Sequence, residues 1–514
     1  MNWKLYLALI GLSVQPLAVS SEQIVLKAPE FKLSAGSKPS YQVTRLTRNI
    51  DAAGAITRET SVMWIKRLGG KTQDWILPIE HQRASKISFM EVVKGQGDAA
   101  ESSEAKRLAI ALKGIDSETK THFYQIDWPE SADEETAVTI KFHFINLTKP
   151  KPTELRQTEG NKQGMYWEGD LLGGLGAIPG IFSETAELKV QVKCPTSRVL
   201  EKLPPSGFHV QQASGANIVI FTNKLSAPEL LNERQYGYVL FYQPHPVMVI
   251  RNLTRLVEVS HWGNNVAIED QIYLENRGPK LRGAFSRWVH QSSLHTRAPG
   301  ATSHILTGLT LELPQGVSSP YYIDTIGNVS TSRFRPSTPP ELLNPQKQSK
   351  FKKYKEAKFS KLELSPRYPI AGGWNYSFVI GYNLEAGRLL KKTAKDEYVL
   401  KIPFFTNAVD VPIELGTLRV RLPEGSSQVK VFAPFPTTET QTDLIDKTYL
   451  DTTGRPTVFI KKLACTEKHA GDVYITYTRS PMRGLQKPMA ISGWMMLLFM
   501  LTAGLRRFQW KIGY

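Results

Sequence analysis

Residues 253–279 read LTRLVEVSHWGNNVAIEDQIYLENRGP, a stretch that has the pattern of a β-hairpin. Thr254 to Ser260, which contains Thr, Leu and two Val, is predicted to form a strand. Gly263-Asn264-Asn265 tolerates positive φ and therefore predicts a turn. After the turn, apolar residues return to one face, and Asp270 interrupts that face as a predicted bulge or polar contact.

The same stretch superficially resembles a catalytic set, because Ser260 and His261 are followed closely by Glu269 and Asp270. Neighbouring residues in a strand point to opposite faces, so Ser260 and His261 do not readily form a side-chain hydrogen bond. We therefore interpret His261 and Trp262 as packing or partner-contact residues near a turn.

A second stretch repeats this pattern. Residues 43–70, VTRLTRNIDAAGAITRETSVMWIKRLGG, also contain Thr-Arg-Leu, a strand, a Gly-containing turn, a strand through an acidic residue and a second Gly. Further along each half, AELKVQVKCP (186–195) matches GTLRVRLPEG (416–425) in the same order. The repeats predict two tandem β-domains of related design that join near residues 243–246.

Strand-like alternation dominates the rest of the chain. It is clear in TAVTIKFHFINL (136–147) and in GDVYITYT (471–478). The best candidate for a helix is AESSEAKRLAIAL (100–112).

The N-terminus has the features of a secretory signal peptide over residues 1–20. A basic start precedes the apolar run at 5–14, which is too short to span a bilayer. Ala18 and Ser20 are small residues at the positions expected before a cleavage site, which lies before Ser21.

A second apolar run, MAISGWMMLLFMLTAGL (489–505), contains no charged residue. Its length is at the lower limit for a membrane-spanning helix, and it predicts a transmembrane helix at 487–505. A buried helix and a GPI-anchor signal are the alternatives. With the signal peptide, this span places residues 21–486 in the lumen and leaves 506–514 as a short cytosolic tail.

These observations predict a mostly β fold: two tandem lumenal β-sandwich-like domains followed by one C-terminal transmembrane helix. We expect the first domain at 21–243 and the second at 244–486. The second domain contains a Lys-rich inserted loop at about 336–361. Such like-charged sequence is typical of a solvated loop, and contact with anionic lipid or phosphate groups is the alternative.

Composition narrows the function. The chain carries 64 Lys and Arg against 47 Asp and Glu, a formal charge of +17. Export makes nucleic acid an unexpected partner despite this charge. The only two cysteines, Cys194 and Cys465, exclude a disulfide scaffold and leave one bridge or two free thiols open.

The sequence lacks the motifs of metal-dependent hydrolases and of serine hydrolases with a nucleophile elbow. The glycine-rich segment GGLGAIPG (173–180) lacks dinucleotide-binding spacing. We therefore expect no catalytic residue, cofactor or metal. Four Asn-x-Ser/Thr sequons are candidate N-glycosylation sites: Asn146, Asn252, Asn328 and Asn375.

Several segments of the second half resemble ribophorin I, in the order expected for that family. The segments are TRLVEVSHWGNNVAIED (254–270), GAFSRW (283–288), YYIDTIGNVSTS (321–332), SPRYPIAGGW (365–374), VIGYNL (379–384), LPEG (422–425) and TYLDTTGRP (448–456). The resemblance is diffuse over the first half, where YWEGD (166–170) fits. Two features depart from the family pattern: the Lys-rich loop and the short segment 506–514 after the apolar run.

The resemblance implies a non-catalytic, single-pass subunit of the oligosaccharyltransferase complex, which transfers oligosaccharide from dolichol pyrophosphate to Asn of Asn-x-Ser/Thr. Its implied partners are the multi-spanning catalytic subunit and the other subunits, the nascent polypeptide and the endoplasmic reticulum membrane, with the translocon as a further candidate. The implied role is to brace the complex and to guide or retain acceptor chains, for example by pairing an exposed sheet edge with an extended peptide.

Two other functions remain open at this point. An accessory subunit of another lumenal complex, of the GPI transamidase type, would share the topology but not the motifs. A membrane-tethered glycan hydrolase would need two carboxylates facing a cleft, and no such pair stands out in the sequence.

Overall fold

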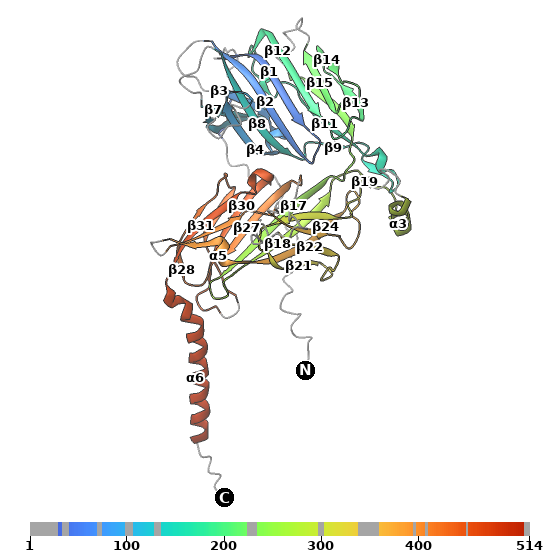
Figure 1. Cartoon of the computed structure of the whole chain (residues 1–514). Coiled ribbons are helices and arrows are strands. Elements are labelled where there is room, and N and C mark those ends of the chain that lie inside the picture. The colour runs from blue at the N-terminus through green and yellow to red at the C-terminus, as the bar shows by residue number, and fades with distance from the viewer. Residues whose placement is uncertain are drawn as a thin grey trace, which may run out of the picture.

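The computed structural model of the chain describes residues 29–32, 41–68, 75–97, 106–127, 135–223, 234–296, 303–337, 359–393, 397–406, 410–448 and 451–507. These residues are mostly in strands that form two stacked bodies, and one long helix leaves the second body (Figure 1). The predicted mostly β fold with a C-terminal apolar helix is confirmed. The predicted signal peptide, with Ser20 and Ser21, lies outside the described residues.

Within the described part of the chain, the first domain is built on a sheet of eight strands. In order across the sheet these are β14 (Phe208–Gln211), β15 (Ile218–Asn223), β12 (Phe182–Lys193), β1 (Tyr41–Asp51), β2 (Ile56–Arg67), β8 (Glu135–Ile145), β4 (Ile87–Lys94) and β5 (Arg107–Leu108). Only β1 and β12 are parallel neighbours in this sheet; the other described pairs are antiparallel.

Two smaller sheets share one hydrophobic core with this long sheet. One contains β3 (Trp75–Glu80), β7 (Thr121–Ile126) and β6 (Ile110–Asp116); the other contains β13 (Val199–Leu203), β16 (Tyr236–Tyr242), β11 (Gly164–Asp170) and β9 (Lys149–Pro150). Leu46 and Ile50 of the long sheet are buried in that core with Trp75 and Trp167 of the smaller sheets.

The second domain has the same three-sheet design around its own core. Its long sheet runs β29 (Glu439–Asp446), β30 (Arg455–Cys465), β27 (Ile413–Arg421), β17 (Met248–Ser260), β18 (Asn265–Asn276), β24 (Asn375–Glu385) and β21 (Ser318–Asp324). Its smaller sheets are β20 (Leu309–Leu313), β23 (Ser360–Leu364) and β22 (Ser332–Arg335), and β28 (Ser426–Phe432), β31 (Asp472–Arg479), β26 (Glu397–Pro403) and β25 (Leu390–Lys392).

The topology confirms the internal repeat. In both domains an antiparallel hairpin, β1–β2 or β17–β18, lies at the centre of the long sheet. The first strand of each hairpin also pairs in parallel with a later strand, β12 or β27. The outer strands follow in the same spatial order in the two domains, so the second domain repeats the connectivity of the first.

The alignment of the repeat within these strands differs from the predicted one. The shared element is Leu-Thr-Arg, at 46–48 and 253–255, because it follows a bulge in both strands and ends in a buried Arg. The sequence comparison instead placed Arg45, which is exposed, opposite Arg255. In the parallel strands, Leu188 corresponds to Gly416 and not to Leu418. Leu188 lies opposite Leu46, and Gly416 lies opposite Leu253, the residue equivalent to Leu46.

The remaining elements are short, apart from two helices. They are α1 (His81–Ala84), β10 (Glu154–Leu155), η2 (Gly160–Lys162), η3 (Leu175–Ala177), β19 (Lys280–Leu281), α3 (Arg287–Thr296), α5 (Ala386–Leu389), η5 (Glu467–His469), η6 (Pro481–Leu485) and α6 (Gln486–Arg507). Helix α6 contains the predicted span 487–505 and is long and apolar enough to cross a membrane.

The helix predicted at 100–112 is wrong where the structure describes it. Residues 107–108 form β5, and Ile110–Asp116 forms β6, which pairs with β7. A carboxylate oxygen of Asp116 accepts hydrogen bonds from the backbone N–H groups of Glu118 and Thr119, at 2.9 and 3.4 Å, and so closes the turn of this hairpin. Cross-strand pairing therefore overrides the helical propensity of the Ala- and Leu-containing sequence.

The Lys-rich loop at about 336–361 lies largely outside the described residues. Its last two residues, Ser360 and Lys361, belong to β23 and not to the loop. Because β22 and β23 are antiparallel neighbours, the segment connects two strands of one small sheet.

The two cysteines do not form a disulfide. Cys194 is buried in the first domain and Cys465 in the second, and both are free thiols. Burial raises the pKa of each thiol to about 12, so both are protonated at neutral pH.

Candidate functional site: the joints of the two domains

The polar residues of the β17–β18 hairpin contact four different partners. Ser260 Oγ accepts from the backbone of Gly263 at 3.1 Å, and His261 Nε2 lies 2.7 Å from the hydroxyl of Tyr477. Tyr321 donates to Glu269 at 2.9 Å. Asp270 is buried, where it binds an Arg of the neighbouring strand. The arrangement is that of a packed hairpin and not of a nucleophile with its base.

His261 is a packing residue, as the hairpin pattern predicts. Its ring lies edge-on to Tyr398, with 4.6 Å between the ring centroids. Burial, reinforced by the charge of Arg479, lowers the pKa of His261 to about 4, so the imidazole is neutral at pH 7.

A buried Arg–carboxylate pair fastens the central hairpin of the second domain. Arg255 Nε and Nη2 lie 2.6 and 2.7 Å from the two carboxylate oxygens of Asp270, and both side chains are fully buried. Arg255 also donates to Thr406 Oγ1 and to the carbonyl of Pro403. Burial alone would lower the pKa of Arg255, but the charge of Asp270 overrides it and raises that pKa above its ordinary value.

The first domain contains a similar pair, in which the Arg is at the equivalent position but the carboxylate is two residues earlier on the second strand, because Arg255 faces Asp270 whereas Arg48 faces Ser61. Arg48 Nε donates to Glu59 at 2.9 Å, and Arg83 adds a second cation 2.6 Å from the same carboxylate. Burial would raise the pKa of Glu59, but the two guanidinium groups lower it to about 2. Arg48 also donates to the carbonyls of Asp170 and Leu171.

The glycine-rich segment at 173–180 covers this buried Arg. Gly173 lies against the guanidinium group of Arg48, and Gly174 has φ +95°. A Cβ at Gly174 would lie 2.0 Å from the carbonyl oxygen of Pro78, so only glycine fits. The glycines therefore have a packing role.

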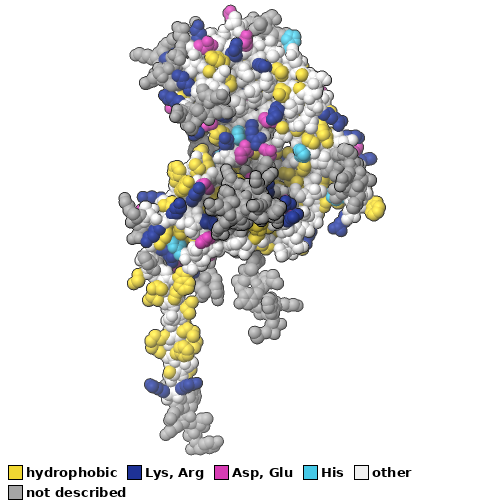
Figure 2. All heavy atoms as spheres, viewed as in Figure 1, with side chains coloured by type: hydrophobic (Ala, Val, Ile, Leu, Met, Phe, Trp, Pro, Cys, Tyr) yellow, Lys and Arg dark blue, Asp and Glu magenta, His cyan; other side chains and the backbone are white. Residues whose placement is uncertain are grey.

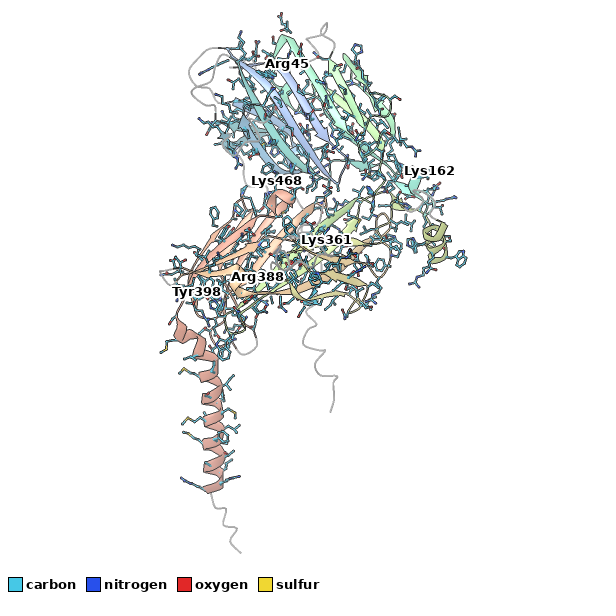
Figure 3. The ribbon with its side chains drawn as sticks, viewed as in Figure 1. Arg45, Lys162, Lys361, Arg388, Tyr398 and Lys468 are labelled. Carbon is cyan, nitrogen blue, oxygen red and sulfur yellow. The ribbon has the colours of Figure 1, made fainter. Side chains whose placement is uncertain are left out.

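The first joint between the domains is ionic. Arg58 of β2 donates to Glu467 at 2.9 Å and to Asp410 at 2.6 Å, both in the second domain. His143 of β8 lies 3.7 Å from Glu467. Burial lowers the pKa of His143 to about 4, so it is neutral at pH 7 and Arg58 supplies the charge. Lys468, labelled in Figure 3 where the domains meet, lies over the ring of Phe89.

Further contacts extend the joint on both sides. Ser88 Oγ donates to Thr466 Oγ1 at 3.0 Å in a buried position, and Asn146 Nδ2 donates to Glu414 at 2.6 Å. Strand β10 of the first domain pairs in parallel with β19 of the second. Because the domains touch through both side chains and backbone, they are held in one relative orientation.

A second joint ties the second domain to α6. Trp262 Nε1 at the hairpin tip donates to the carbonyl of Gly484 in η6 at 3.1 Å. Lys487, in the first turn of α6, lies 2.5 Å from Asp451. The side chain of Asp451 is fully buried and is also contacted by Arg455 and by the backbone N–H of Thr448.

The charge of Asp451 holds this joint together. Burial would raise the pKa of this carboxyl, but hydrogen bonds from Lys487 and Thr448 and the charge of Arg455 hold it well below its usual range. The nearby Glu424 accepts from the backbone of Thr452 and Thr453 at 2.9 and 2.6 Å. The segments LPEG and TYLDTTGRP, separate in the sequence, thus meet beside the start of α6.

Other sequence motifs also meet in pairs. Asp324 of YYIDTIGNVSTS binds Arg367 of SPRYPIAGGW at 2.6 and 3.0 Å. Phe285 of GAFSRW packs against Trp374, with 5.5 Å between the ring centroids. These motifs therefore stabilise the second domain by contacting one another.

The four sequon asparagines differ in their exposure to solvent. Asn252 on β17, Asn328 after β21 and Asn375 at the start of β24 are exposed. Asn146 is half-buried, because its side-chain amide takes part in the interdomain joint.

The sequence analysis identified His261 and Trp262 but not the ionic residues of the joints. Arg58, Glu467 and Asp451 are ordinary charged residues among many, and their partners lie far away in the sequence. The one available signal was that Asp451 and Glu424 fall inside motifs of the resemblance.

Comparison with known proteins gives a consistent result. A family model described as Ribophorin I matches residues 41–506. The chain is 25% identical to the Caenorhabditis elegans dolichyl-diphosphooligosaccharide–protein glycosyltransferase subunit 1 over 93% of this chain and 74% of that protein. It is 24% identical to subunit 1B of Arabidopsis thaliana over 91% of this chain and 92% of that protein.

Similarity to solved structures is weak. A structure of native yeast LTA4 hydrolase aligns with 42% of this chain and 31% of its own, at 8% identity and a TM-score of 0.25. That score supports no argument about this chain. The match to the family model, in contrast, spans both β-domains and α6, and the chain belongs to the ribophorin I family.

Proposed function

We propose that this chain is a non-catalytic, single-pass subunit of the oligosaccharyltransferase complex of the endoplasmic reticulum membrane, supporting N-linked glycosylation. The observation that carries the proposal is the family match over residues 41–506, together with relatives named as subunit 1 of that transferase. Helix α6 supplies one apolar span. In this proposal a cleaved signal peptide (1–20) precedes lumenal domains at 21–243 and 244–486, and 506–514 is cytosolic.

The proposed role is to brace the complex. The interdomain joint fixes the first domain on the second, and the Asp451–Lys487 joint fixes the second domain on α6. A subunit built this way holds a large lumenal surface at a constant position relative to the membrane, beside the multi-spanning catalytic subunit.

A further proposed role is to guide or retain acceptor polypeptides. The long sheet of the second domain ends in β21 and β29, whose outer edges have no partner strand among the described residues, although Asn328 and Val329 bridge the end of β21. An extended peptide can add to such an edge. Both strands are interrupted by irregular register, so pairing would extend over only a few residues.

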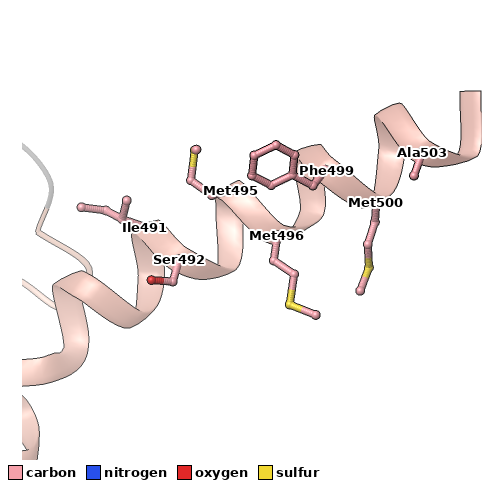
Figure 4. A pocket seen from close by; sticks show the side chains of 7 residues that line it. All are labelled: Ile491, Ser492, Met495, Met496, Phe499, Met500 and Ala503. Carbon is pink, nitrogen blue, oxygen red and sulfur yellow. The ribbon is translucent and has the colours of Figure 1, made fainter. Parts of the chain in front are cut away.

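One face of α6 is the proposed contact for another subunit's transmembrane helix. Figure 4 shows a shallow groove along this helix, lined by Ile491, Ser492, Met495, Met496, Phe499, Met500 and Ala503. Ser and Ala allow close approach of a second helix, and flexible Met side chains fill irregular gaps.

The test is extraction of the full chain in mild detergent, followed by identification of the proteins that co-purify and a transfer assay. We expect the other transferase subunits to co-purify and the isolated chain to transfer no oligosaccharide to an acceptor peptide. Transfer by the isolated chain, or stable extraction without transferase subunits, would contradict the proposal.

Two matched variants test the helix contact in the same experiment. Ala503→Phe fills the groove, and we expect about fivefold weaker co-purification, because about 1 kcal/mol of steric cost has that effect. Leu501→Phe places a Phe on the opposite side of α6 and should leave co-purification unchanged. Equal effects of both variants would show that the groove is not the contact.

The sequons provide a separate prediction. We expect glycans on Asn252, Asn328 and Asn375 but not on Asn146, because a glycan on Asn146 Nδ2 would have to fit into the interdomain joint, where this atom lies 2.6 Å from Glu414. In cells, each of N252Q, N328Q and N375Q should increase gel mobility by one glycan, and N146Q should not. A glycan on Asn146, detected by glycopeptide mass spectrometry, would mean that this interdomain contact does not form.

A further inference from the structure

Exposed apolar side chains gather where the second domain meets α6. Trp262 at the hairpin tip is 73% exposed, and Met482, Leu485 and Met489 are exposed on η6 and the first turn of α6. Figure 2 shows hydrophobic side chains at this end of the domain, continuous with those of the helix. Large apolar residues exposed together mark an interaction surface.

The patch is built by two segments that are distant in the sequence. The hydrogen bond from Trp262 Nε1 to the carbonyl of Gly484 fixes the hairpin tip against η6. The Asp451–Lys487 pair fixes the next turn of the chain. The indole is therefore held at a set height above the apolar part of α6.

Helix geometry places that height at the bilayer surface. Met489 to Leu505 rises about 26 Å, slightly less than the roughly 30 Å thickness of a hydrocarbon core, so Met489 lies within about 2 Å of the core boundary. Gly484 precedes Met489 by five residues, which corresponds to about 8–10 Å. The apolar run is about 4 Å shorter than a core of roughly 30 Å, so the core boundary lies about 2 Å beyond Met489 and the indole lies about 6–8 Å above that boundary, in the outer part of a headgroup layer about 5–8 Å thick.

The charge around the patch is also suited to a lipid surface. Helix α5 adjoins the hairpin tip through the hydrogen bond from Ala386 to the carbonyl of Asn264. Arg388 of α5, and Lys391 and Lys392 of β25, are exposed there. Figure 3 labels Arg388 and Tyr398 at this end of the domain. Trp at the interface with cations nearby is typical of surfaces that contact lipid headgroups.

We propose that the β17–β18 hairpin tip, with η6 and the first turn of α6, forms a contact with the bilayer surface. Trp262 and Leu485 enter the headgroup layer, Met482 lies at its outer edge, and the exposed cations of α5 and β25 face lipid phosphates. The second domain then rests on the membrane at a fixed tilt. This contact requires α6 to cross the membrane and does not depend on the proposed transferase role.

The test uses the full chain in lipid nanodiscs, with lipids brominated near the ester linkage as short-range quenchers of Trp fluorescence. The emission of Trp262 is obtained as the difference between the unmodified chain and Trp262→Phe. We expect brominated lipid to lower this difference at least about twofold, and aqueous iodide to quench it weakly.

Trp288→Phe is the matched control. Trp288 is 78% exposed on α3, on the far side of the domain from α6 (Figure 1). We expect its emission to be quenched by iodide and unaffected by brominated lipid. Trp494, inside α6, reports in every sample that the helix is inserted.

The proposal is overturned if the Trp262 component is insensitive to brominated lipid while iodide quenches it as strongly as Trp288. It is also overturned if Trp262 becomes protected from iodide only when other membrane proteins are added. In that case the patch belongs to a protein contact.

Discussion

Replacing Arg255 with Met should destabilise the second domain by about 3–5 kcal/mol, because among the described residues it leaves the buried carboxylate of Asp270 with only Thr406 as a partner. Hydrogen exchange of the full chain in detergent, followed by mass spectrometry, resolves the two domains. The most protected amides of β17 and β18 should exchange about two to four orders of magnitude faster. Those of β1 and β2 should change little.

Arg45→Met is the matched control. Arg45 forms an ion pair with Glu187 in which both side chains are more than half exposed, and removal of such a pair costs at most about 1 kcal/mol. Arg48→Met should have an intermediate effect on the first domain, because Glu59 keeps Arg83. If Arg45→Met costs as much as Arg48→Met, the Leu-Thr-Arg alignment of the two domains is wrong.

A second substitution distinguishes the loss of charge pairing from the loss of packing in Arg255→Met. Adding Asp270→Leu to Arg255→Met removes the unpaired carboxylate and should recover at least half of the lost stability. Without such recovery, the loss would come from the space that Arg255 fills and not from the orphaned charge.

Asp451→Asn should loosen the attachment of the second domain to α6. It removes a charge that receives hydrogen bonds from Lys487, Arg455 and Thr448, at a cost of about 1.5–3 kcal/mol. Since the pKa of Asp451 lies below its usual range, the carboxylate is ionised at pH 7, where the loss applies in full. Faster hydrogen exchange in residues 451–455 and 479–487 is the measurement.

Asp443→Asn controls for the substitution itself. Asp443 is exposed on β29 and accepts one hydrogen bond, from Thr442, so we expect a change within about 0.5 kcal/mol. Lys487→Met removes the other partner of Asp451. If the costs of Asp451→Asn and Lys487→Met simply add in the double variant, the two residues do not form the joint.

These joints explain how the two domains are held in place relative to each other and to α6. Arg58 connects the domains through carboxylates on two separate segments, Asp410 and Glu467. Asp451 connects the second domain to the membrane helix. Each joint uses a charged side chain at least partly removed from water, where an ion pair is least screened by salt.

Much of the architecture was predictable from the sequence because it depends on local periodicity. The alternation in 136–147 and 471–478 identifies β8 and β31, and the uncharged run at 489–505 identifies α6. The order of the repeated segments identifies two related β-domains, and the motifs of the second half identify the family. The helix expected at 100–112 was wrong because hairpin pairing outweighs the intrinsic preference of a short segment.

By itself, then, the sequence determined the class of fold, the membrane helix, the repeat and the family. Each of these depends on patterns within short segments of the chain. Only the tertiary structure decided which of Arg45 and Arg48 is buried, because a bulge between Val43 and Arg45 sets which face of β1 the following residues occupy. It also decided that Leu188 corresponds to Gly416, because a shift of two residues along a strand leaves its buried face unchanged. The partners of Arg58 and Asp451 come from distant segments, and only folding brings those charges together.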